Sequence, residues 1–217
     1  LELMEFRIQD ISDSTLAFNF SNSIDERVNK HINLLSESLI SEDLDLLSIY
    51  PTYTSLIVTY NPLLIKRVEI IKRVEKLNKT IKSYEKIESQ ILEIPVRYGG
   101  KSGEDLKDLE KILSISQEQI IDIHSSKSYY VFMVGFSPGF PYLGGLDKRL
   151  ECPRLSTPRV EVPAGSVAIA DKQTGIYPLK SSGGWRIIGN TNLKLFDETK
   201  NSPSLISPGM KIKFIPL

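Results

Sequence analysis

The densest group of residues that could bind a ligand lies between positions 135 and 146, Gly-Phe-Ser-Pro-Gly-Phe-Pro-Tyr-Leu-Gly-Gly-Leu. These twelve residues include three aromatics, two prolines and four glycines, so they can form neither a regular helix nor a central strand. Glycine lets the backbone approach a ligand closely, and a proline-stiffened loop can present aromatic faces. The segment predicts either a tightly packed turn or a binding wall with the contact residues Phe136, Pro138, Gly139 and Tyr142.

Two arginines in the next cluster each follow a proline, at Pro153-Arg154 and Pro158-Arg159. A guanidinium presents a rigid fork of N–H donors that fits a carboxylate or a phosphate, so both side chains could bind an anion. They could equally be surface side chains in a proline-rich loop. Spacing alone leaves both alternatives open.

A third cluster lies between residues 173 and 186 and contains the single tryptophan of the chain. Gly183 and Gly184 precede Trp185 and allow close backbone approach, which would place an indole beside the guanidinium of Arg186. Trp185 could equally be a core residue. Two further candidate contacts in this cluster are Gln173 and Tyr177.

Other residues give weaker signals of chemistry. His124 closes a short helix that a Ser116 and Gln119 capping box should start, and it could be a general base or a polar core residue. The chain has two histidines and one cysteine, Cys152, so zinc-ligand spacing is absent and no metal site is expected. Gly100-Lys101-Ser102 matches only the end of a phosphate-binding loop motif. These residues alone predict a ligand-binding protein and define no reaction.

The elements around these clusters predict an α+β protein in two parts. Residues 1–90 alternate short strands with two amphipathic helices, which predicts a small α/β domain. The first helix should be capped by Ser23, and Asn61-Pro62 should open the second, with Leu64 on its buried side. Residues 91–217 contain many short strands separated by Gly/Pro turns, which predicts a closed or nearly closed β-barrel.

The composition limits the classes of function. Of the 217 residues, 41% are hydrophobic and 25% are charged, which is typical of a soluble globular protein. Lys plus Arg and Asp plus Glu both number 27, so neither nucleic acid nor an anionic membrane is an expected partner. No apolar run approaches the roughly 20 residues of a membrane span. A single cysteine favours a cytoplasmic protein.

The blocks at 135–146, 163–170, 173–178 and 183–189 resemble, in order, the signature blocks of one protein family. It is the family of the B component of 5-oxoprolinase, also known as allophanate hydrolase subunit 1 and as the kinase inhibitor KipI. The resemblance extends over nearly the whole chain. It implies a small N-terminal α/β domain followed by a cyclophilin-like β-barrel.

The resemblance also implies an activity and partners. Family members pair with a larger, similarly built C component and with an A component, and together they hydrolyse 5-oxoproline to L-glutamate with hydrolysis of ATP. This chain alone should be nearly inactive, and ATP should be bound by the complex, in a component that the resemblance does not identify. Inhibition of a sporulation-type histidine kinase is one alternative, and hydrolysis of allophanate or another small amide is a second.

The ring amide of 5-oxoproline is an unstrained lactam, so its hydrolysis needs cations and donors around the developing anionic charge. We therefore expect positive charge from Arg154, Arg159 and Arg186. Substrate should be oriented by Gln173 and Tyr177, and a proton carried by His124.

Three positions depart from the pattern of the family. Ser182 stands where proline is expected before Gly-Gly-Trp, Asp171 where glycine is common, and Asn190 where arginine is usual. The departure at Asn190 removes a possible guanidinium, so an anion site near that residue is in doubt.

Overall fold

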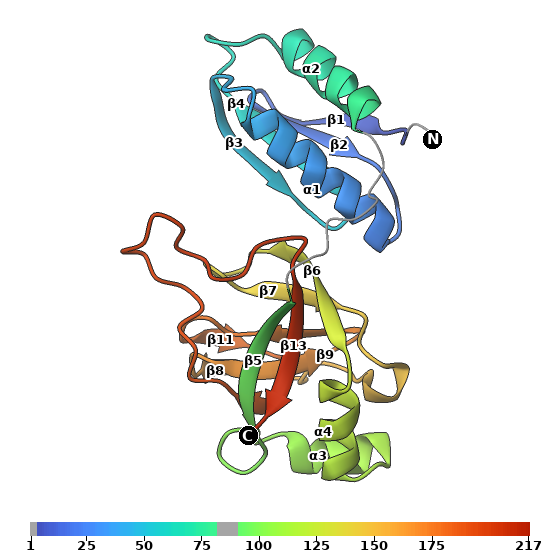
Figure 1. Ribbon diagram of the computed structural model, residues 1–217, viewed down its shortest axis with the longest axis vertical. Coiled ribbons are helices and arrows are strands. Elements are labelled where there is room, and N and C mark those ends of the chain that lie inside the picture. Colours follow the sequence, from blue (N-terminus) through green and yellow to red (C-terminus); the bar gives the residue numbers. More distant parts are fainter. Residues whose placement is uncertain (1–3, 82–90) are drawn as a thin grey trace. The chain divides into compact units, whose positions relative to one another are not determined.

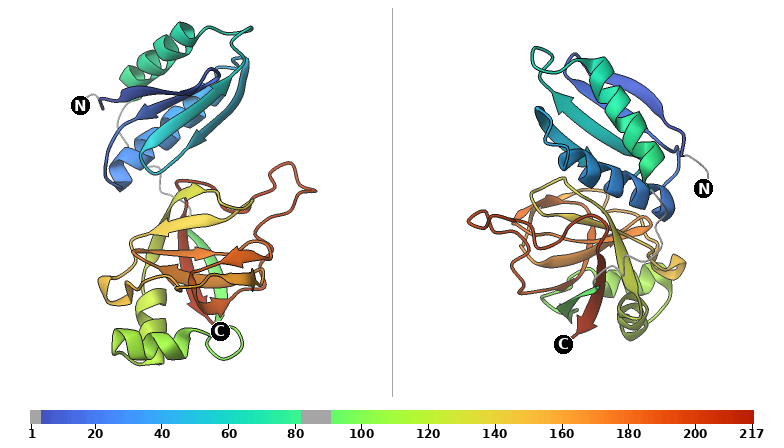
Figure 2. Two further views of the ribbon diagram at one scale, coloured as in Figure 1. Left: turned by 180° about the vertical axis from the view of Figure 1, so that it is seen from behind. Right: turned by 45° about the horizontal axis from the view of Figure 1, so that its top comes forward.

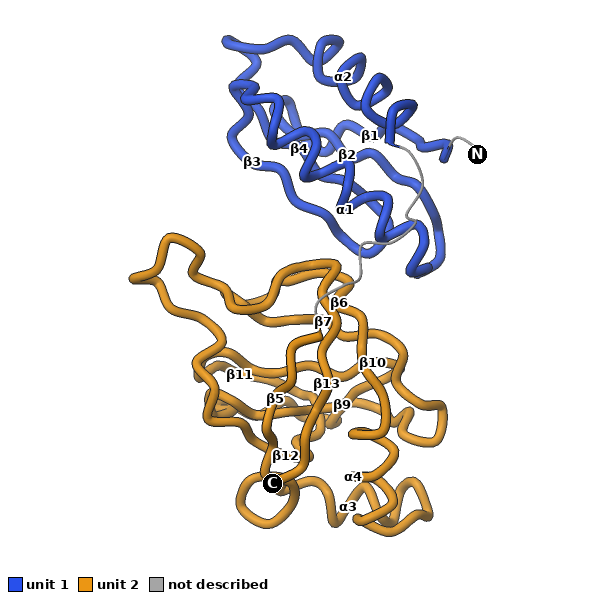
Figure 3. Tube along the Cα trace, in the orientation of Figure 1, with its two compact units in different colours: residues 1–88 blue, residues 89–217 orange. Residues whose placement is uncertain are grey.

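The computed structural model describes residues 4–81 and 91–217. The chain forms two compact units, residues 1–88 and residues 89–217, which are coloured separately in Figure 3. The domain boundary predicted between residues 90 and 91 adjoins a stretch that lies outside the described residues. Each unit contains a hydrophobic core of its own, as a folding unit requires.

The first unit is an antiparallel sheet with two helices packed on one of its faces (Figures 1 and 2). Its elements are β1 (Arg7–Ser12), β2 (Thr15–Asn19), α1 (Glu26–Ile40), β3 (Leu46–Pro51), β4 (Ser55–Tyr60) and α2 (Arg67–Thr80). The strand order is β1-β2-β4-β3. Leu16 and Phe18 of β2 are fully buried because alternate residues of a strand point to the same face, here the face that the helices cover.

Both helices of this unit begin later than the sequence pattern predicts. Helix α1 is capped by Asp25 rather than Ser23, because the Asp25 carboxylate accepts a backbone N–H of the first turn at 3.0 Å. Helix α2 begins at Arg67, because the side chain of Asn61 accepts the backbone N–H two residues further on and forms a turn instead. Leu64, which was expected to be buried, is therefore 67% exposed.

The second unit is a closed β-barrel with two short helices at one end (Figure 1). The barrel strands are β5 (Ile91–Tyr98), β6 (Ser128–Val134), β7 (Pro141–Gly144), β9 (Ser166–Ala170), β10 (Gln173–Ile176), β12 (Arg186–Asn190) and β13 (Lys211–Pro216). The remaining elements are α3 (Leu106–Leu113), α4 (Gln117–Ser125), the 3-10 helix η1 (Lys148–Leu150), β8 (Arg159–Val162) and β11 (Ser181–Gly183). The predicted α+β class and the predicted barrel are confirmed.

The barrel closes in the order β10-β7-β6-β13-β5-β12-β9, with β9 pairing back to β10. Every neighbouring pair is antiparallel except β13 and β5, which run in parallel. Outside the barrel, β8 and β11 form a two-stranded ribbon. Among the helices of the described residues, none combines the length and the apolar character that crossing a membrane would require.

Strand β9 is buried on both of its faces. Val167 and Ile169 point into the barrel and join its core. Ala168 and Ala170 point the other way and pack in a separate apolar cluster against the outside of the barrel wall. A strand covered on both sides is expected to be apolar throughout, as this one is apart from its first residue, Ser166. The barrel wall therefore supports a second apolar layer, and the candidate site lies in that layer.

Helix α3 is attached to the barrel through backbone contacts at Gly103 and Asp105. The Asp105 N–H donates to the Ile187 carbonyl at 3.0 Å, and the Ile187 N–H donates to the Asp105 carboxylate at 2.6 Å. A Cβ atom at Gly103 would lie 2.1 Å from the carbonyl oxygen of Ile188. Only glycine fits at this position unless α3 moves away from β12.

We predict that Gly103→Ala lowers the free energy of unfolding by about 2 kcal/mol, because the added methyl group collides with backbone rather than with a side chain that can move. Urea denaturation of the purified chain measures this change. Gly184→Ala is the matched control, since its Cβ would meet only Pro158, at 3.6 Å. Equal stability of the two variants would contradict the prediction.

Candidate functional site

The aromatic residues of the first and third sequence clusters meet on the outside of the barrel, around Phe140. The ring of Phe140 is 2% exposed and contacts four other rings edge-on. Its centroid lies 5.0 Å from Tyr142, 5.2 Å from Tyr177, and 5.6 Å from both Phe136 and Trp185. Edge-to-face pairs at these distances are favourable arrangements of the ring quadrupoles. We refer to these five residues as the aromatic cluster.

Glycines make the close packing of the aromatic cluster possible. A Cβ at Gly175 would lie 3.0 Å from both Phe140 and Trp185. A Cβ at Gly183 would lie 2.2 Å from the hydroxyl oxygen of Tyr177. Of the predicted contact residues, Gly183 thus has a packing role, because it leaves room for the ring of Tyr177.

Arg154 provides an accessible positive charge beside the aromatic cluster. Its guanidinium lies over the ring of Trp185, with 5.9 Å between the Cζ atom and the ring centroid, and its side chain is 58% exposed. The Nε atom of Arg154 donates to the Asp171 carboxylate at 3.0 Å. Asp171 has a φ of +53°, a left-handed conformation that glycine adopts without strain.

The hydroxyl groups of Tyr142 and Tyr177 stay protonated at neutral pH. Burial raises the pKa of both side chains, and the positive charge of Arg154 opposes this rise only in part. Arg159 also lowers the pKa of Tyr177 slightly, so Tyr177 lies within electrostatic reach of both arginines. Protonated phenols can donate hydrogen bonds to a bound anion or carbonyl.

Arg159 is held differently from Arg154. Its Nη2 atom lies 2.6 Å from Asp105 Oδ1 and its Nε atom lies 2.9 Å from Glu104 Oε1, with the side chain 24% exposed. Two carboxylates therefore neutralise this guanidinium and attach β8 to the start of α3. Neither carboxylate was singled out from the sequence, because their partner lies more than fifty residues away along the chain.

Arg186 and Gln173 support the site from its edge. The Arg186 Nε atom donates to the carbonyl of Pro153 at 3.0 Å, and the Leu155 N–H donates to the Gly184 carbonyl at 2.8 Å. These two bonds fix the loop that carries Arg154 against the start of β12. Gln173 begins β10, opposite Ala170 of β9 in the register of that pair.

His124 lies inside the barrel, on the opposite side of its wall from the aromatic cluster. Its ring is fully buried and stacks on Phe214 at 4.5 Å between centroids. Its Nε2 atom lies 2.9 Å from Thr174 Oγ1, and Thr174 points inward while its neighbour Gly175 packs against Phe140 outside. The predicted role of His124 as a proton carrier finds no support in this geometry.

The hydrogen bonds of His124 define a neutral ring. The Thr174 hydroxyl donates to the Ala168 carbonyl at 3.0 Å, so it accepts the Nε2–H of His124. The Tyr98 hydroxyl then donates to Nδ1 at 2.7 Å. Burial lowers the pKa of His124 to about 3, because water is excluded from the charged form.

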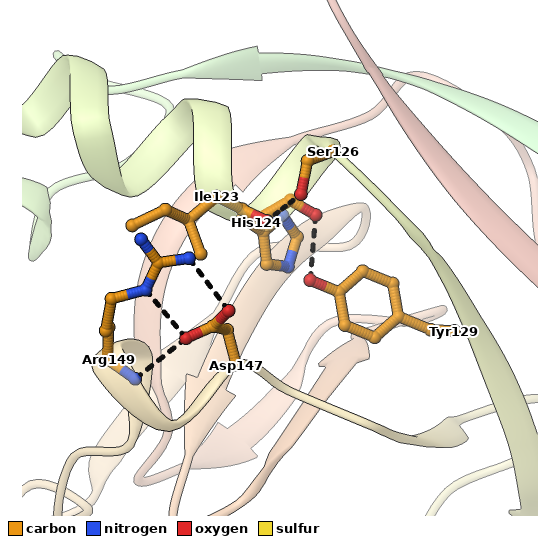
Figure 4. A network of polar contacts seen from close by, with 6 residues as sticks. All are labelled: Ile123, His124, Ser126, Tyr129, Asp147 and Arg149. Carbon is orange, nitrogen blue, oxygen red and sulfur yellow. Dashed lines mark hydrogen bonds and ion pairs between the residues drawn. The ribbon is translucent and has the colours of Figure 1, made fainter.

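The chain around His124 is held by local contacts, which Figure 4 shows. The Tyr129 hydroxyl donates to the carbonyl of His124 at 2.8 Å, and Ser126 Oγ donates to the carbonyl of Ile123 at 2.9 Å. Nearby, Asp147 accepts bonds from both the backbone and the guanidinium of Arg149, which holds the pKa of Asp147 well below its usual range. These contacts stabilise the end of α4 and the start of η1, so their role is structural.

The turn at Gly100-Lys101-Ser102 does not fit the phosphates of ATP. The N–H groups of Ser102 and Gly103 donate to the carbonyl of Gly99, at 3.0 and 2.9 Å, rather than facing a ligand. The carboxylates of Glu104 and Asp105 follow directly, and negative charge repels phosphate. The partial sequence match to a phosphate-binding loop therefore does not correspond to such a site in the structure.

Comparison with known proteins identifies the class to which this barrel and its aromatic cluster belong. The family model for the carboxyltransferase domain, subdomain C and D, matches residues 6–206. The chain therefore belongs to this carboxyltransferase-domain family.

Relatives that carry the name of the B component of 5-oxoprolinase include proteins from Bacillus subtilis and Haemophilus influenzae. The protein from Bacillus subtilis is 38% identical over 224 residues, which cover 98% of this chain and 93% of that protein. The protein from Haemophilus influenzae is 45% identical over 163 residues, which cover 75% of this chain and 73% of that protein. The family resemblance found in the sequence is confirmed.

Solved structures agree with the fold. The crystal structure of TTHA0988 matches 94% of this chain with a TM-score of 0.85 and 33% identity, but this chain spans only 40% of that longer chain. The uncharacterized protein PH0987 from Pyrococcus horikoshii is 40% identical and matches 97% of both chains with a TM-score of 0.58. The urea amidolyase of K. lactis is 16% identical and shares the fold.

We predict that His124 makes stability depend on pH. The pKa of His124 is about 3 in the folded chain against 6.5 for an ordinary histidine, so the unfolded chain binds more protons between these values. The contribution of the neutral His124 ring to the free energy of unfolding is therefore complete above about pH 6.5. It is lost progressively as the pH falls toward the folded-state pKa. Between pH 7 and pH 5, the free energy of unfolding should drop by about 2 kcal/mol more in the natural chain than in His124→Gln. Urea denaturation at both pH values measures this, and equal drops would contradict it.

Proposed function

We propose that this chain is the B component of an ATP-dependent 5-oxoprolinase, which hydrolyses 5-oxoproline to L-glutamate. The observation that carries the proposal is its 38% identity to the B. subtilis protein of that name over nearly the full length of both chains. Inhibition of a histidine kinase is not favoured, because the named relatives are part of an enzyme or a putative urea carboxylase.

The proposed complex contains a larger C component and an A component, and it works in the cytoplasm. The names of the relatives describe one subunit of an enzyme, which supports the need for partners. Because the glycine turn before α3 does not fit phosphates, we assign ATP to the complex as a whole and route no step through it in this chain. This chain alone is then nearly inactive.

Arg154 is the residue that we propose to bind the anionic group of the substrate. 5-Oxoproline carries a carboxylate, and an exposed guanidinium stacked on an indole is a good partner for one. Asp171 engages the Nε atom of Arg154, and a guanidinium has further N–H donors for an anion. Arg159 is a positioning residue in this proposal, because its charge is already paired with two carboxylates.

The two tyrosines play different parts in the proposed site. Tyr142 is half-buried at the edge of the cluster, and its ring lies 5.9 Å from that of Trp185. The hydroxyl of Tyr177 is bonded to the backbone of Trp185, which fixes its direction. Tyr177 is 1% exposed, so it supports the surface from below. The phenol of Tyr142 is protonated at neutral pH, so it can donate to a lactam carbonyl whose oxygen gains negative charge during ring opening.

We predict that glutamate is released from 5-oxoproline and ATP only when this chain is combined with its two proposed partners. Each of the three proteins is omitted in turn, and glutamate and ADP are measured. Release in the complete mixture and in no incomplete one supports the proposed function. A complete, folded mixture that releases no glutamate rules out 5-oxoproline as the substrate.

We predict that Arg154→Ala lowers the activity of the assembled complex at least about tenfold, with a smaller loss in Arg154→Lys, because the guanidinium binds the substrate anion. Stability should change by less than about 0.5 kcal/mol, since the ion pair with Asp171 is exposed. Arg149→Ala is the matched control, because it removes another exposed arginine–aspartate pair of the same unit. Equal activities of the two alanine variants would contradict the assignment.

A further inference from the structure

Phe136 combines two features that are unfavourable for an isolated fold. Its φ is +71°, a left-handed conformation that is a genuine outlier for a bulky side chain. Its ring is 65% exposed, although rings of this size usually lie in the core. Backbone strain of this kind persists where it serves a function, so Phe136 needs an explanation outside the packing of the barrel.

The loop around Phe136 holds the residue in this conformation. The Gly135 N–H donates to the Phe140 carbonyl, and the Phe140 N–H donates to the Ser137 carbonyl, both at 3.0 Å. Gly139 supplies a second left-handed position, with φ of +80°. The hydroxyl of Ser137 is buried and has no hydrogen-bond partner among the described residues. The loop is thus well fixed, but its interactions are incomplete in this chain alone.

A projecting arm, residues 192–205, contacts this loop. The arm lies between β12 and β13 in the chain. Leu195 near its start is buried in the barrel core, and the tip of the arm extends away from the barrel in each view of Figures 1 and 2. At its base the arm packs on the loop, since a Cβ at Gly139 would lie 3.1 Å from the Cβ of Phe196. The loop and the arm therefore form one continuous surface.

The arm has its own internal structure although it projects into solvent. Phe196 and Ser204 form an isolated antiparallel β-bridge, and the Asp197 N–H donates to the Pro203 carbonyl at 2.7 Å. The Asp197 carboxylate accepts the hydroxyl of Thr199 at 2.7 Å and pairs with Lys194 at 3.0 Å, which lowers its pKa to about 2. A loop built in this way presents a defined shape to a partner at a low cost in conformational entropy.

We propose that Phe136 and the arm form the docking surface for the polypeptide that completes the carboxyltransferase domain. The family model covers subdomains C and D only, and in TTHA0988 the related fold occupies 40% of a longer chain. Small ligands bind in concave sites that cover most of their surface, whereas an exposed ring beside a projecting arm matches a protein interface. Exposed aromatic residues often anchor such interfaces. This inference rests on the proposed membership of a multi-protein complex.

The backbone strain gives a test that separates docking from folding. Phe136→Gly removes the ring and also relieves the left-handed strain, while Phe136→Ala removes the ring and keeps the strain. We expect both variants to bind the larger C component at least about tenfold more weakly than the natural chain. The melting temperature of the glycine variant should equal or exceed that of the alanine variant.

The affinity is measured by calorimetric titration of this chain with the purified C component. Leu205→Glu, at an arm residue that is 44% exposed, should also weaken binding and keeps the test valid if the loop variants misfold. Ile112→Ala, at a 45% exposed residue on α3, is the control that should bind normally. Binding within twofold of the natural chain for Phe136→Gly and Leu205→Glu would overturn the proposal. The proposal would also be overturned if the natural chain formed a concentration-dependent dimer and Phe136→Gly abolished that dimer, because the surface would then bind a second copy of this chain.

The same preparation separates this proposal from the proposed function. If the natural chain binds the C component but the full mixture releases no glutamate, the proposed reaction fails and the docking surface stands. If the natural chain supports glutamate release, and the loop and arm variants bind the C component as tightly as the natural chain does, the proposed reaction stands and the docking surface fails.

Discussion

The candidate site depends on one strand, β9, being buried on both of its faces. Its larger residues, Val167 and Ile169, fill the barrel, and its alanines face outward. Because alanine has only a methyl group, the rings of the aromatic cluster can approach the barrel wall closely. The glycines of neighbouring segments act in the same way, since Gly175 and Gly183 give space to rings that a methyl group would push away. The site is therefore a layer of aromatic side chains on a rigid support, which holds polar groups in fixed positions.

The position of each charged group relative to this layer decides its proposed role. Arg154 and Arg159 look equivalent in the sequence, since each follows a proline. In the fold, Arg159 meets two carboxylates at the start of α3, whereas Arg154 lies over an indole and remains 58% exposed. The arginine side chain is thus part of the scaffold at position 159 and accessible to solvent at position 154.

Much of the fold could be predicted from the sequence because its signals are local. The barrel follows from short strands between Gly/Pro turns, and the capping box of Ser116 and Gln119 is present as expected. The start of α1 was misplaced because Ser23 and Asp25 are both good caps and only tertiary structure selects between them. The pairing of Arg159 with Asp105 and the inward direction of His124 join segments 54 and 50 residues apart, and no local pattern encodes such distances.

The parallel pairing of β5 with β13 has a consequence for the synthesis of the protein. These are the first and last strands of the barrel, and their register joins Ile91 to Lys211 and Val96 to Pro216. The whole barrel unit forms the crossover between them. A nascent chain on the ribosome therefore cannot close the barrel until its final strand has left the exit tunnel. Until then β5 has an open edge, and contacts of such long sequence separation form slowly. A chaperone that covers that edge during translation would shield the barrel when it is most exposed to aggregation.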